Sequence, residues 1–63
     1  MSANNQIIIS RKDNTFTIKE CDADTGHVNQ DLGVTSSLGD AIRKANRYMK
    51  KNEVEYGISF SNI

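Results

Sequence analysis

Apolar and polar positions follow a helical period most clearly in one stretch of the chain, residues 37–52. Apolar side chains recur there every three or four residues, at Leu38, Ala41, Ile42, Ala45, Tyr48 and Met49. This spacing places them on one side of an α-helix. Ser37 is a suitable N-cap with Asp40 three residues later, and Asn52 suits a left-handed residue directly after the helix. We therefore predict one amphipathic helix, with the rest of the chain forming a sheet against its apolar side.

Alternation of apolar and polar residues, which is typical of strands, marks the segments on either side of this helix. Residues 7–10 and 15–21 are predicted as the first two strands, joined by a turn over residues 11–14, in which Asp-Asn tolerates the backbone of a tight turn. Residues 27–34 form a less regular third strand, in which Gly33 suits a bulge, after a turn in which Gly26 suits a positive φ. Residues 53–60 alternate most clearly and are predicted as the last strand. Residues 1–6 are polar and are expected to be frayed.

The order strand, strand, strand, helix, strand predicts a two-layer α+β fold, with one helix on one face of a mostly antiparallel sheet. Residues 1–63 then form a single small domain. The expected core consists of the apolar sides of these elements: Ile7 or Ile8, Ile9, Phe16, Ile18, Val28, Leu32, Leu38, Ile42, Ala45, Met49, Val54, Tyr56, Ile58 and Phe60. The opposite face of the sheet should be polar, with Thr15, Thr17, Lys19, Glu53, Glu55 and Ser59. Nothing in the sequence hides the edge strands from pairing with another chain.

Length and composition limit how such a domain is stabilised. The chain has 63 residues and one cysteine, so an internal disulfide is impossible, and it lacks a Cys/His cluster for a structural metal. Stability must come from one small core, or from that core and a partner chain. The first residues do not have the pattern of a signal peptide, and the longest apolar run, residues 7–9, is far shorter than a membrane span. We therefore expect a cytoplasmic protein.

Charge is balanced in sum but unevenly distributed along the chain. Eight basic and eight acidic residues give a formal net charge of zero, which argues against general coating of nucleic acids. Residues 20–31 contain four acidic residues and no Lys or Arg, whereas residues 43–51 contain five basic residues and no acid. The folded molecule is therefore predicted to be electrically polarised.

Residues 22–26, Asp-Ala-Asp-Thr-Gly, have the spacing of acidic residues that opens a calcium-binding loop. The pattern fails further on, because the fifth position is Gly26, the twelfth is Gly33 instead of Glu, and no helix precedes the segment. A solvated hairpin turn is the better interpretation.

Cys21 and His27 flank this turn and are the only residues of their types. A Cys–His nucleophile also needs an orienting third group, an oxyanion hole and a substrate pocket, for which so short a chain has little room. The four glycines are scattered and form no phosphate-binding loop. We expect no catalytic residue, no cofactor and no metal ion, and we expect that the protein is not an enzyme.

The basic residues of the predicted helix are the leading candidates for a binding surface. They lie opposite its apolar stripe, at Arg43, Lys44, Arg47, Lys50 and Lys51. Such a stripe either contacts phosphates or an acidic protein surface, or is simply the solvated side of the helix. A second, acidic patch is predicted at Asp22, Asp24 and Asp31. Most aromatic residues are assigned to the core and are not free to stack on bases, which favours a protein over a nucleic acid as the partner.

At residues 37–42 (SLGDAI) and 55–58 (EYGI), and in element order over residues 7–60, the chain resembles small βββαβ proteins of bacteriophages and mobile elements. HicB-type antitoxin domains and small phage inhibitors of bacterial RNA polymerase are examples. HicB-type domains have a longer sheet and usually a DNA-binding tail, which these 63 residues do not contain, so no functional residue is transferred from them. The resemblance implies a protein that binds and modulates a larger one.

Together, these observations predict a small non-enzymatic protein-binding or regulatory module, of the kind with which a phage or mobile element inhibits a host macromolecule. The alternative is a nucleic-acid-binding module that uses the basic helix. The expected partner is a larger host or cognate protein, with a homodimer through a sheet edge compatible with either function. No membrane partner is expected.

Overall fold

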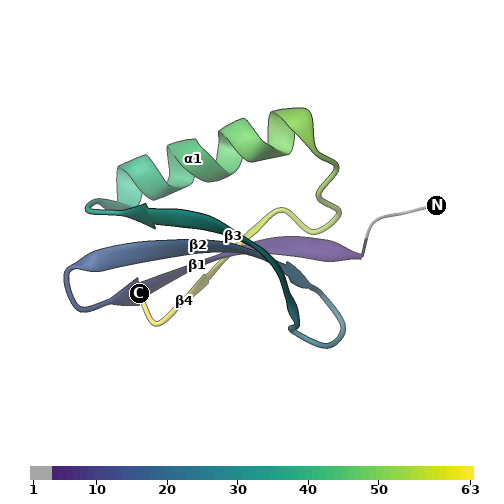
Figure 1. Cartoon of the computed structure of the whole chain (residues 1–63), viewed down its shortest axis with the longest axis horizontal. Helices are drawn as coiled ribbons and strands as arrows, with labels where there is room; N and C mark the ends of the chain where they lie inside the picture. Colours follow the sequence, from purple (N-terminus) through teal and green to yellow (C-terminus); the bar gives the residue numbers. More distant parts are fainter. Residues whose placement is uncertain (1–3) are drawn as a thin grey trace.

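The computed structural model describes residues 4–63, which form a four-stranded sheet covered on one face by a helix (Figure 1). The elements in chain order are β1 (Asn5–Lys12), β2 (Thr15–Asp22), β3 (Val28–Thr35), α1 (Leu38–Lys51) and β4 (Ile58–Ser61). This order and the packing of α1 on the sheet confirm the predicted two-layer α+β fold.

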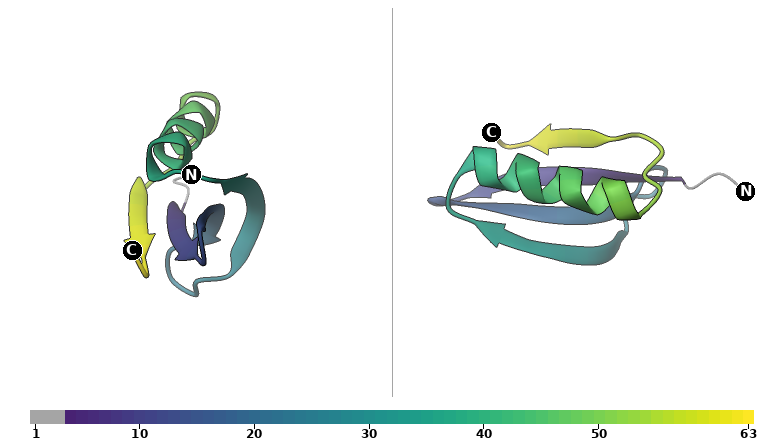
Figure 2. Two further views of the ribbon diagram at one scale, coloured as in Figure 1. Left: turned by 90° about the vertical axis from the view of Figure 1, so that its left-hand side faces the viewer. Right: turned by 90° about the horizontal axis from the view of Figure 1, so that it is seen from above.

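The strand order in the sheet is β3-β2-β1-β4. The pairings of β1 with β2 and of β2 with β3 are antiparallel, as expected for hairpins, whereas β1 and β4 are parallel. The parallel pairing arises because α1 carries the chain from β3, at one edge, back across the sheet to β4 at the other edge (Figure 2). The β1–β2 hairpin therefore occupies the centre, and β3 and β4 are the two edges.

The core lies between the central hairpin and α1. Ile7 and Ile9 of β1 and Ile18 of β2 are fully buried, and Ile9 is directly opposite Ile18 in the sheet. Ala41 and Ala45 are the buried residues of α1, and their small side chains let the helix backbone approach these isoleucines closely. Partly buried apolar residues surround this centre, namely Phe16, Leu32, Leu38, Ile42, Tyr48, Met49, Val54 and Ile58.

Both ends of α1 are capped by side chains, although one differs from the prediction. The Ser37 hydroxyl accepts a hydrogen bond from the Asp40 backbone N–H (3.2 Å), so Ser37 is the N-cap, as predicted. Asn52 is extended, with φ −135°, and the predicted left-handed conformation is wrong. The reason is local, because the backbone N–H and the side-chain amide of Asn52 both donate to the Tyr48 carbonyl.

The last strand is shorter than the alternation predicts, because residues 53–57 form a loop held by Asn5. The Asn5 side chain accepts a hydrogen bond from the Glu55 N–H (3.0 Å) and donates one to the Glu53 carbonyl (3.0 Å). The Tyr56 N–H donates to the Asn5 carbonyl (3.0 Å), and Gly57 with φ +72° turns the chain into β4. The backbone groups of this loop therefore bond to Asn5 instead of extending the β-ladder.

This loop changes the predicted faces of the domain. Tyr56 is 60% exposed instead of belonging to the core, and Glu53 and Glu55 lie in the loop instead of on the sheet. Phe60 and Val28, also predicted as core, are 53% and 43% exposed. Phe60 lies on the edge strand β4, beside the helix, whereas Val28 is level with Cys21 and so lies on the sheet face opposite α1.

The start of β1 is also more ordered than the sequence predicts. Residues 1–3 lie outside the described residues, but β1 begins at Asn5, inside the segment expected to be frayed. It also continues to Lys12, so the turn predicted over residues 11–14 is confined to residues 13–14. The side chain of Asn5 is anchored by the loop that follows α1, and only 7% of the residue is exposed. A polar residue at this position thus belongs to the packed interior.

Strand β3 contains two irregularities that distinguish it from the others. The register with β2 shifts between Ile18 and Lys19 and again between Glu20 and Cys21, so Leu32 and Asn29 are extra residues in β3. Gly33, directly after the bulged residue Leu32, has φ +123°, which agrees with its predicted place at a bulge. Such bulges increase the local twist and bend the edge of the sheet.

Candidate functional site: the basic face of the helix

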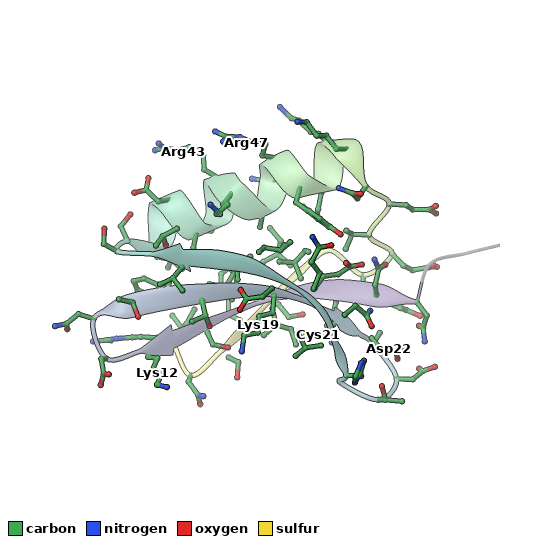
Figure 3. All side chains as sticks on the ribbon, in the orientation of Figure 1. Lys12, Lys19, Cys21, Asp22, Arg43 and Arg47 are labelled. Carbon is green, nitrogen blue, oxygen red and sulfur yellow. The ribbon has the colours of Figure 1, made fainter. Side chains whose placement is uncertain are left out.

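The five basic residues of α1 form an exposed surface, which we call the basic face. All five are exposed, namely Arg43, Lys44, Arg47, Lys50 and Lys51. Arg43 and Arg47 point away from the sheet, on the side opposite Lys12 and Lys19 (Figure 3). Burial of Ala41 and Ala45 on the inner side of α1 fixes this orientation. The structure thus brings the five predicted basic residues together on one rigid element.

Most of this positive charge has no acidic counterpart. Arg43 forms an ion pair with Asp40 at 3.5 Å, and both side chains are largely exposed, so the pair contributes little to stability. Across residues 4–63 no second Lys or Arg side chain lies within ion-pair distance of a carboxylate. The two lysines in the last turn are favoured there by the negative end of the helix dipole. The basic face is therefore available to an acidic partner.

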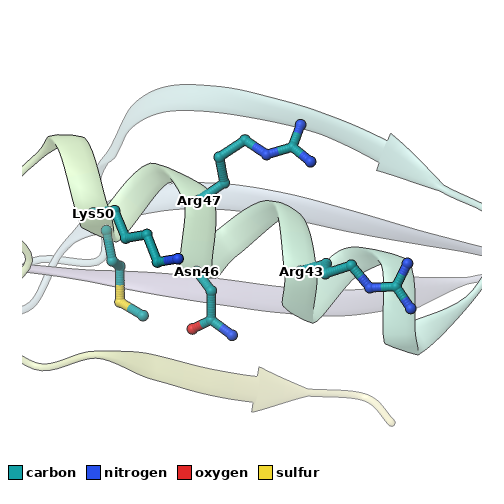
Figure 4. Close-up of a pocket in the computed structure, with 5 residues that line it drawn as sticks. Arg43, Asn46, Arg47 and Lys50 are labelled. Atoms are coloured by element: carbon teal, nitrogen blue, oxygen red, sulfur yellow. The ribbon is translucent and has the colours of Figure 1, made fainter.

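Two hollows adjoin the basic face. The larger, of about 560 Å³, is lined by Arg43, Asn46, Arg47, Met49 and Lys50 (Figure 4). All of these residues belong to α1, so this hollow is a space between long side chains without a wall from a second element. This hollow is open and offers no enclosed place for a substrate.

The smaller hollow, of about 240 Å³, lies between α1 and β3. Its lining residues are Leu32, Lys44, Arg47, Tyr48, Lys51 and Asn52. Three cations here surround partly buried apolar groups contributed by Leu32 and Tyr48. This combination suits a carboxylate side chain accompanied by an apolar neighbour.

Tyr48 connects this hollow to a polar network beneath the helix. Its hydroxyl donates a hydrogen bond to Oε1 of Glu20 at 2.7 Å, and the other carboxylate oxygen of Glu20 accepts one from the Asn5 side chain. The hydrogen bond to Glu20, followed by burial and the Glu20 charge, raises the pKa of Tyr48 to about 12. The Tyr48 hydroxyl is therefore committed to a contact inside the domain.

The three acidic candidates have local structural roles in the turn and strand that carry them. The Asp22 carboxylate accepts hydrogen bonds from the N–H groups of Asp24 and Thr25, and these bonds lower the pKa of Asp22. Asp24 accepts a hydrogen bond from the Asn4 side chain, and Asp31 accepts one from the Gly33 N–H.

These aspartates also lie apart in the sheet. Asp31 is opposite Lys19, three residues along β2 from Asp22, which corresponds to about 10 Å at the usual rise of a strand. Asp22 and Asp24 stay together at the end of the β2–β3 hairpin, with Asp31 further along the edge.

The segment from residue 22 to residue 26 is a hairpin turn, as predicted. Gly26 has φ +78°, and its N–H donates to the Asp22 carbonyl at 2.9 Å. Among residues 4–63 no three His, Cys, Asp or Glu side chains converge as they would around a metal ion. Because the Asp22 carboxylate already binds two backbone N–H groups, its place in the turn is explained without a ligand.

Cys21 and His27 differ in their surroundings. His27 is exposed, whereas Cys21 is buried, although it lies on the sheet face opposite α1, beside Lys19 (Figure 3). Burial raises the pKa of the Cys21 thiol, which disfavours the thiolate that nucleophilic chemistry needs. The position of Cys21 is that of a small packing residue.

Sequence reasoning missed Asn5 and Glu20, which position the helix and the loop after it. Asn5 lies in a polar stretch that resembles a frayed terminus, and Glu20 belongs to an acidic segment that resembles solvated surface. Their contacts join residues 15 to 50 positions apart in the chain. A faint signal does exist, because Glu20 shares its face of β2 with Phe16 and Ile18.

Helix α1 has fourteen residues, and no helix in the described part of the chain combines the length and apolar character needed to cross a bilayer. No protein-family model, curated protein or solved structure matches the chain. The resemblance to small βββαβ proteins of phages and mobile elements therefore stays a prediction from the sequence.

Proposed function

We propose that this protein is a small, non-enzymatic binding module whose basic face recognises an acidic surface on a larger protein. The observation that carries the proposal is the exposure of five cations on one side of a rigid helix, with a single carboxylate, Asp40, paired to them among residues 4–63.

The smaller hollow supports a protein as the partner. An acidic side chain placed between Lys44, Arg47 and Lys51 would pair with cations, while an adjacent apolar group would contact Leu32. Because α1 is held by its buried alanines and both caps, the cations start from a fixed helix, which reduces the entropy lost on binding. Electrostatic attraction of this kind mainly speeds association and selects the partner.

Regulation of the bound protein is part of the same proposal. A domain with so little interior volume acts most simply by covering a surface through which its partner would otherwise bind another molecule. A cytoplasmic location is also proposed, since the free thiol of Cys21 persists in a reducing compartment. Inhibition of a host macromolecule by a phage or mobile-element product is the specific case implied by the sequence resemblance.

Affinity purification followed by quantitative mass spectrometry tests the proposal. Three baits are compared in a lysate of the cells that express the protein: the natural chain, Arg47→Glu/Lys51→Glu, and the control Lys12→Glu/Lys19→Glu. Both variants change the net charge equally, but the control alters the opposite side of the molecule (Figure 3). We expect proteins retained by the natural chain and the control to fall at least about tenfold with the basic-face variant.

Two outcomes would contradict this proposal. Equal retention by all three baits, each verified as folded by circular dichroism, would show that binding does not use the basic face. Retention of nucleic acid instead of protein, with affinity that falls steeply as salt increases, would support the alternative of a nucleic-acid-binding module. The observation that favours this alternative is the exposure of five cations together on the basic face.

A further inference from the structure

Strand β4 forms an open edge of the sheet on a different surface from the basic face. We propose that two copies of the chain associate through their β4 strands, which pair antiparallel about a two-fold axis at Ser59. The two four-stranded sheets then become one continuous sheet, with both helices on the same face. This inference does not depend on the proposed function, since none of the five cations lies in β4.

The direction of the backbone groups shows which of them are free. The Gly57 carbonyl accepts a hydrogen bond from the Ile7 N–H of β1 at 2.8 Å. In a trans peptide the C=O and the following N–H point in opposite directions, so the Ile58 N–H points away from β1. Along an extended strand the direction alternates, which places the N–H and C=O groups of Ile58 and Phe60 on the outer edge and those of Ser59 toward β1.

These free groups determine the register of pairing. The strand cannot extend in either direction, because the Tyr56 N–H already donates to the Asn5 carbonyl and Asn62 has φ +60°. Two outward-facing residues remain, Ile58 and Phe60. When Ile58 is opposite Phe60 of the second copy, and Phe60 is opposite Ile58, all their outward N–H and C=O groups are paired. Ser59 is then opposite Ser59 of the second copy.

Side chains along this edge fit a second copy. Residues 56–63, Tyr-Gly-Ile-Ser-Phe-Ser-Asn-Ile, include no charged residue, so self-pairing brings no like charges together. Tyr56, Phe60 and Ile63 are each more than half exposed. Edge strands are usually protected by short length, Lys, Pro, bulges or an inward-pointing charge, and of these β4 has only its short length.

The position of α1 leaves room for this arrangement. The helix packs on β1, β2 and β3, and Figure 2 shows β4 beside the helix instead of under it. In the parallel register Phe60 is level with Ile9, so its side chain lies on the helix side of the sheet, where it is 53% exposed. Pairing would place Phe60 against Ile58 of the second copy and remove both from water.

Sedimentation velocity over a concentration range tests the proposal with three single-residue variants. The natural chain should shift from its monomer mass of 7.0 kDa toward twice that value as concentration rises. Ser59→Lys and Ser59→Glu each place like charges opposite each other at the two-fold axis, so each variant alone should remain monomeric. A 1:1 mixture of the two should associate again, because Lys is then opposite Glu.

Ser61→Lys is the matched control. Ser61 lies on the same face of β4 but would be opposite Gly57 of the second copy, far from its own counterpart, so this variant should associate like the natural chain. A natural chain that stays at 7.0 kDa at millimolar concentration would overturn the proposal. Association of Ser59→Lys alone, equal to that of the natural chain, would also overturn it, because another surface would then be responsible.

Amide hydrogen exchange on the natural chain provides a measurement that needs no variant. At low concentration the Ile58 and Phe60 amides should exchange faster than the Ser59 amide, which bonds to β1. As concentration rises, the exchange of Ile58 and Phe60 should slow at least about tenfold if they become hydrogen-bonded. Exchange that is independent of concentration at both amides would count against pairing through β4.

Discussion

The two edge strands of this small sheet, β3 and β4, differ in how well they are protected from pairing with another chain. Edge β3 is eight residues long, contains two bulges and carries Asp31, so its backbone is poorly shaped for pairing with another chain. Edge β4 is four residues long, regular and uncharged, with Phe60 exposed. Edge β3 is therefore protected from pairing by its two bulges, whereas edge β4 is regular and open along its four residues.

The edges also differ in how they are attached to the central hairpin. Edge β3 continues from β2 through a tight turn in which the Asp22 carboxylate binds two backbone N–H groups. Edge β4 is joined to β1 without a hairpin, and the preceding loop is held by the side chain of Asn5. Edge β3 is thus held in place by residues close to it in the chain, whereas edge β4 depends on the buried side-chain amide of Asn5.

The largest effect should come from removing that amide. Asn5→Ala leaves the Glu55 N–H and one Glu20 oxygen without their partner, which should destabilise the fold by about 2–4 kcal/mol. A domain of this size is stabilised by only about 3–9 kcal/mol, at typical values per residue. Urea denaturation measures the loss, and amides of β4 should lose protection before those of β3.

Asn29→Ala is the matched control, since Asn29 is exposed at a bulge of β3. Its cost should be below about 0.5 kcal/mol. If Asn5→Ala proved equally mild, the claim that β4 depends on Asn5 would fail.

Alanine substitutions of Gly33 in β3 and of Gly57 before β4 should both lower stability, and their effects should differ by less than those of Asn5→Ala and its control. Gly33→Ala should cost about 2 kcal/mol, because φ +123° is a region that L-residues rarely adopt. The new Cβ would lie 2.9 Å from Cε of Lys44, but this flexible side chain can move aside at little cost. Gly57→Ala should cost about 1 kcal/mol, because φ +72° lies near the left-handed helical region and no other atom is within 4 Å of the new Cβ. Thermal denaturation of both variants gives the order.

Gly39→Ala in α1 provides the control with the opposite sign. Gly39 has an ordinary helical backbone and open space around it, so alanine should stabilise the protein by about 0.5–1 kcal/mol. A larger loss for Gly57→Ala than for Gly33→Ala would mean that the bulge in β3 is less constrained than its geometry indicates.

The smallest effect concerns the tyrosine that ties α1 to β2. Tyr48→Phe should cost about 1 kcal/mol at neutral pH, because it removes the hydrogen bond to Glu20, whereas Tyr56→Phe, at an exposed position, should be nearly neutral. The pKa of Tyr48 is about 12 in the folded chain and about 10 in an unfolded one. The stability that Tyr48 contributes is therefore complete below about pH 10 and is lost as the pH rises toward 12.

Denaturation of the natural chain and of Tyr48→Phe between pH 8 and 12 checks this prediction. The difference in stability between the two should shrink as the pH rises from 10 to 12. A difference that stays constant over this interval would show that the Tyr48 proton is not linked to folding.

Periodicity was sufficient to predict α1 and β2, because their apolar side chains face one core and their spacing follows from helix and strand geometry alone. It failed at residues 53–57, where the alternation of a strand is present but the backbone bonds to Asn5, about 50 positions earlier. Exposure of the basic face followed from the position of each cation on the helix. The Glu20–Tyr48 contact did not, because no local pattern joins residues 28 positions apart.

The parallel pairing of β1 with β4 has a consequence for synthesis on the ribosome. The hairpin of β1 and β2 can form as soon as its residues emerge, but the outer edge of β1 stays without a partner until residues 58–61 have been added. The nascent chain therefore presents Ile7 and Ile9 beside an unpaired strand edge for most of its translation. Completion of the fold is a late, long-range event, and any truncation before β4 should yield a chain prone to aggregation.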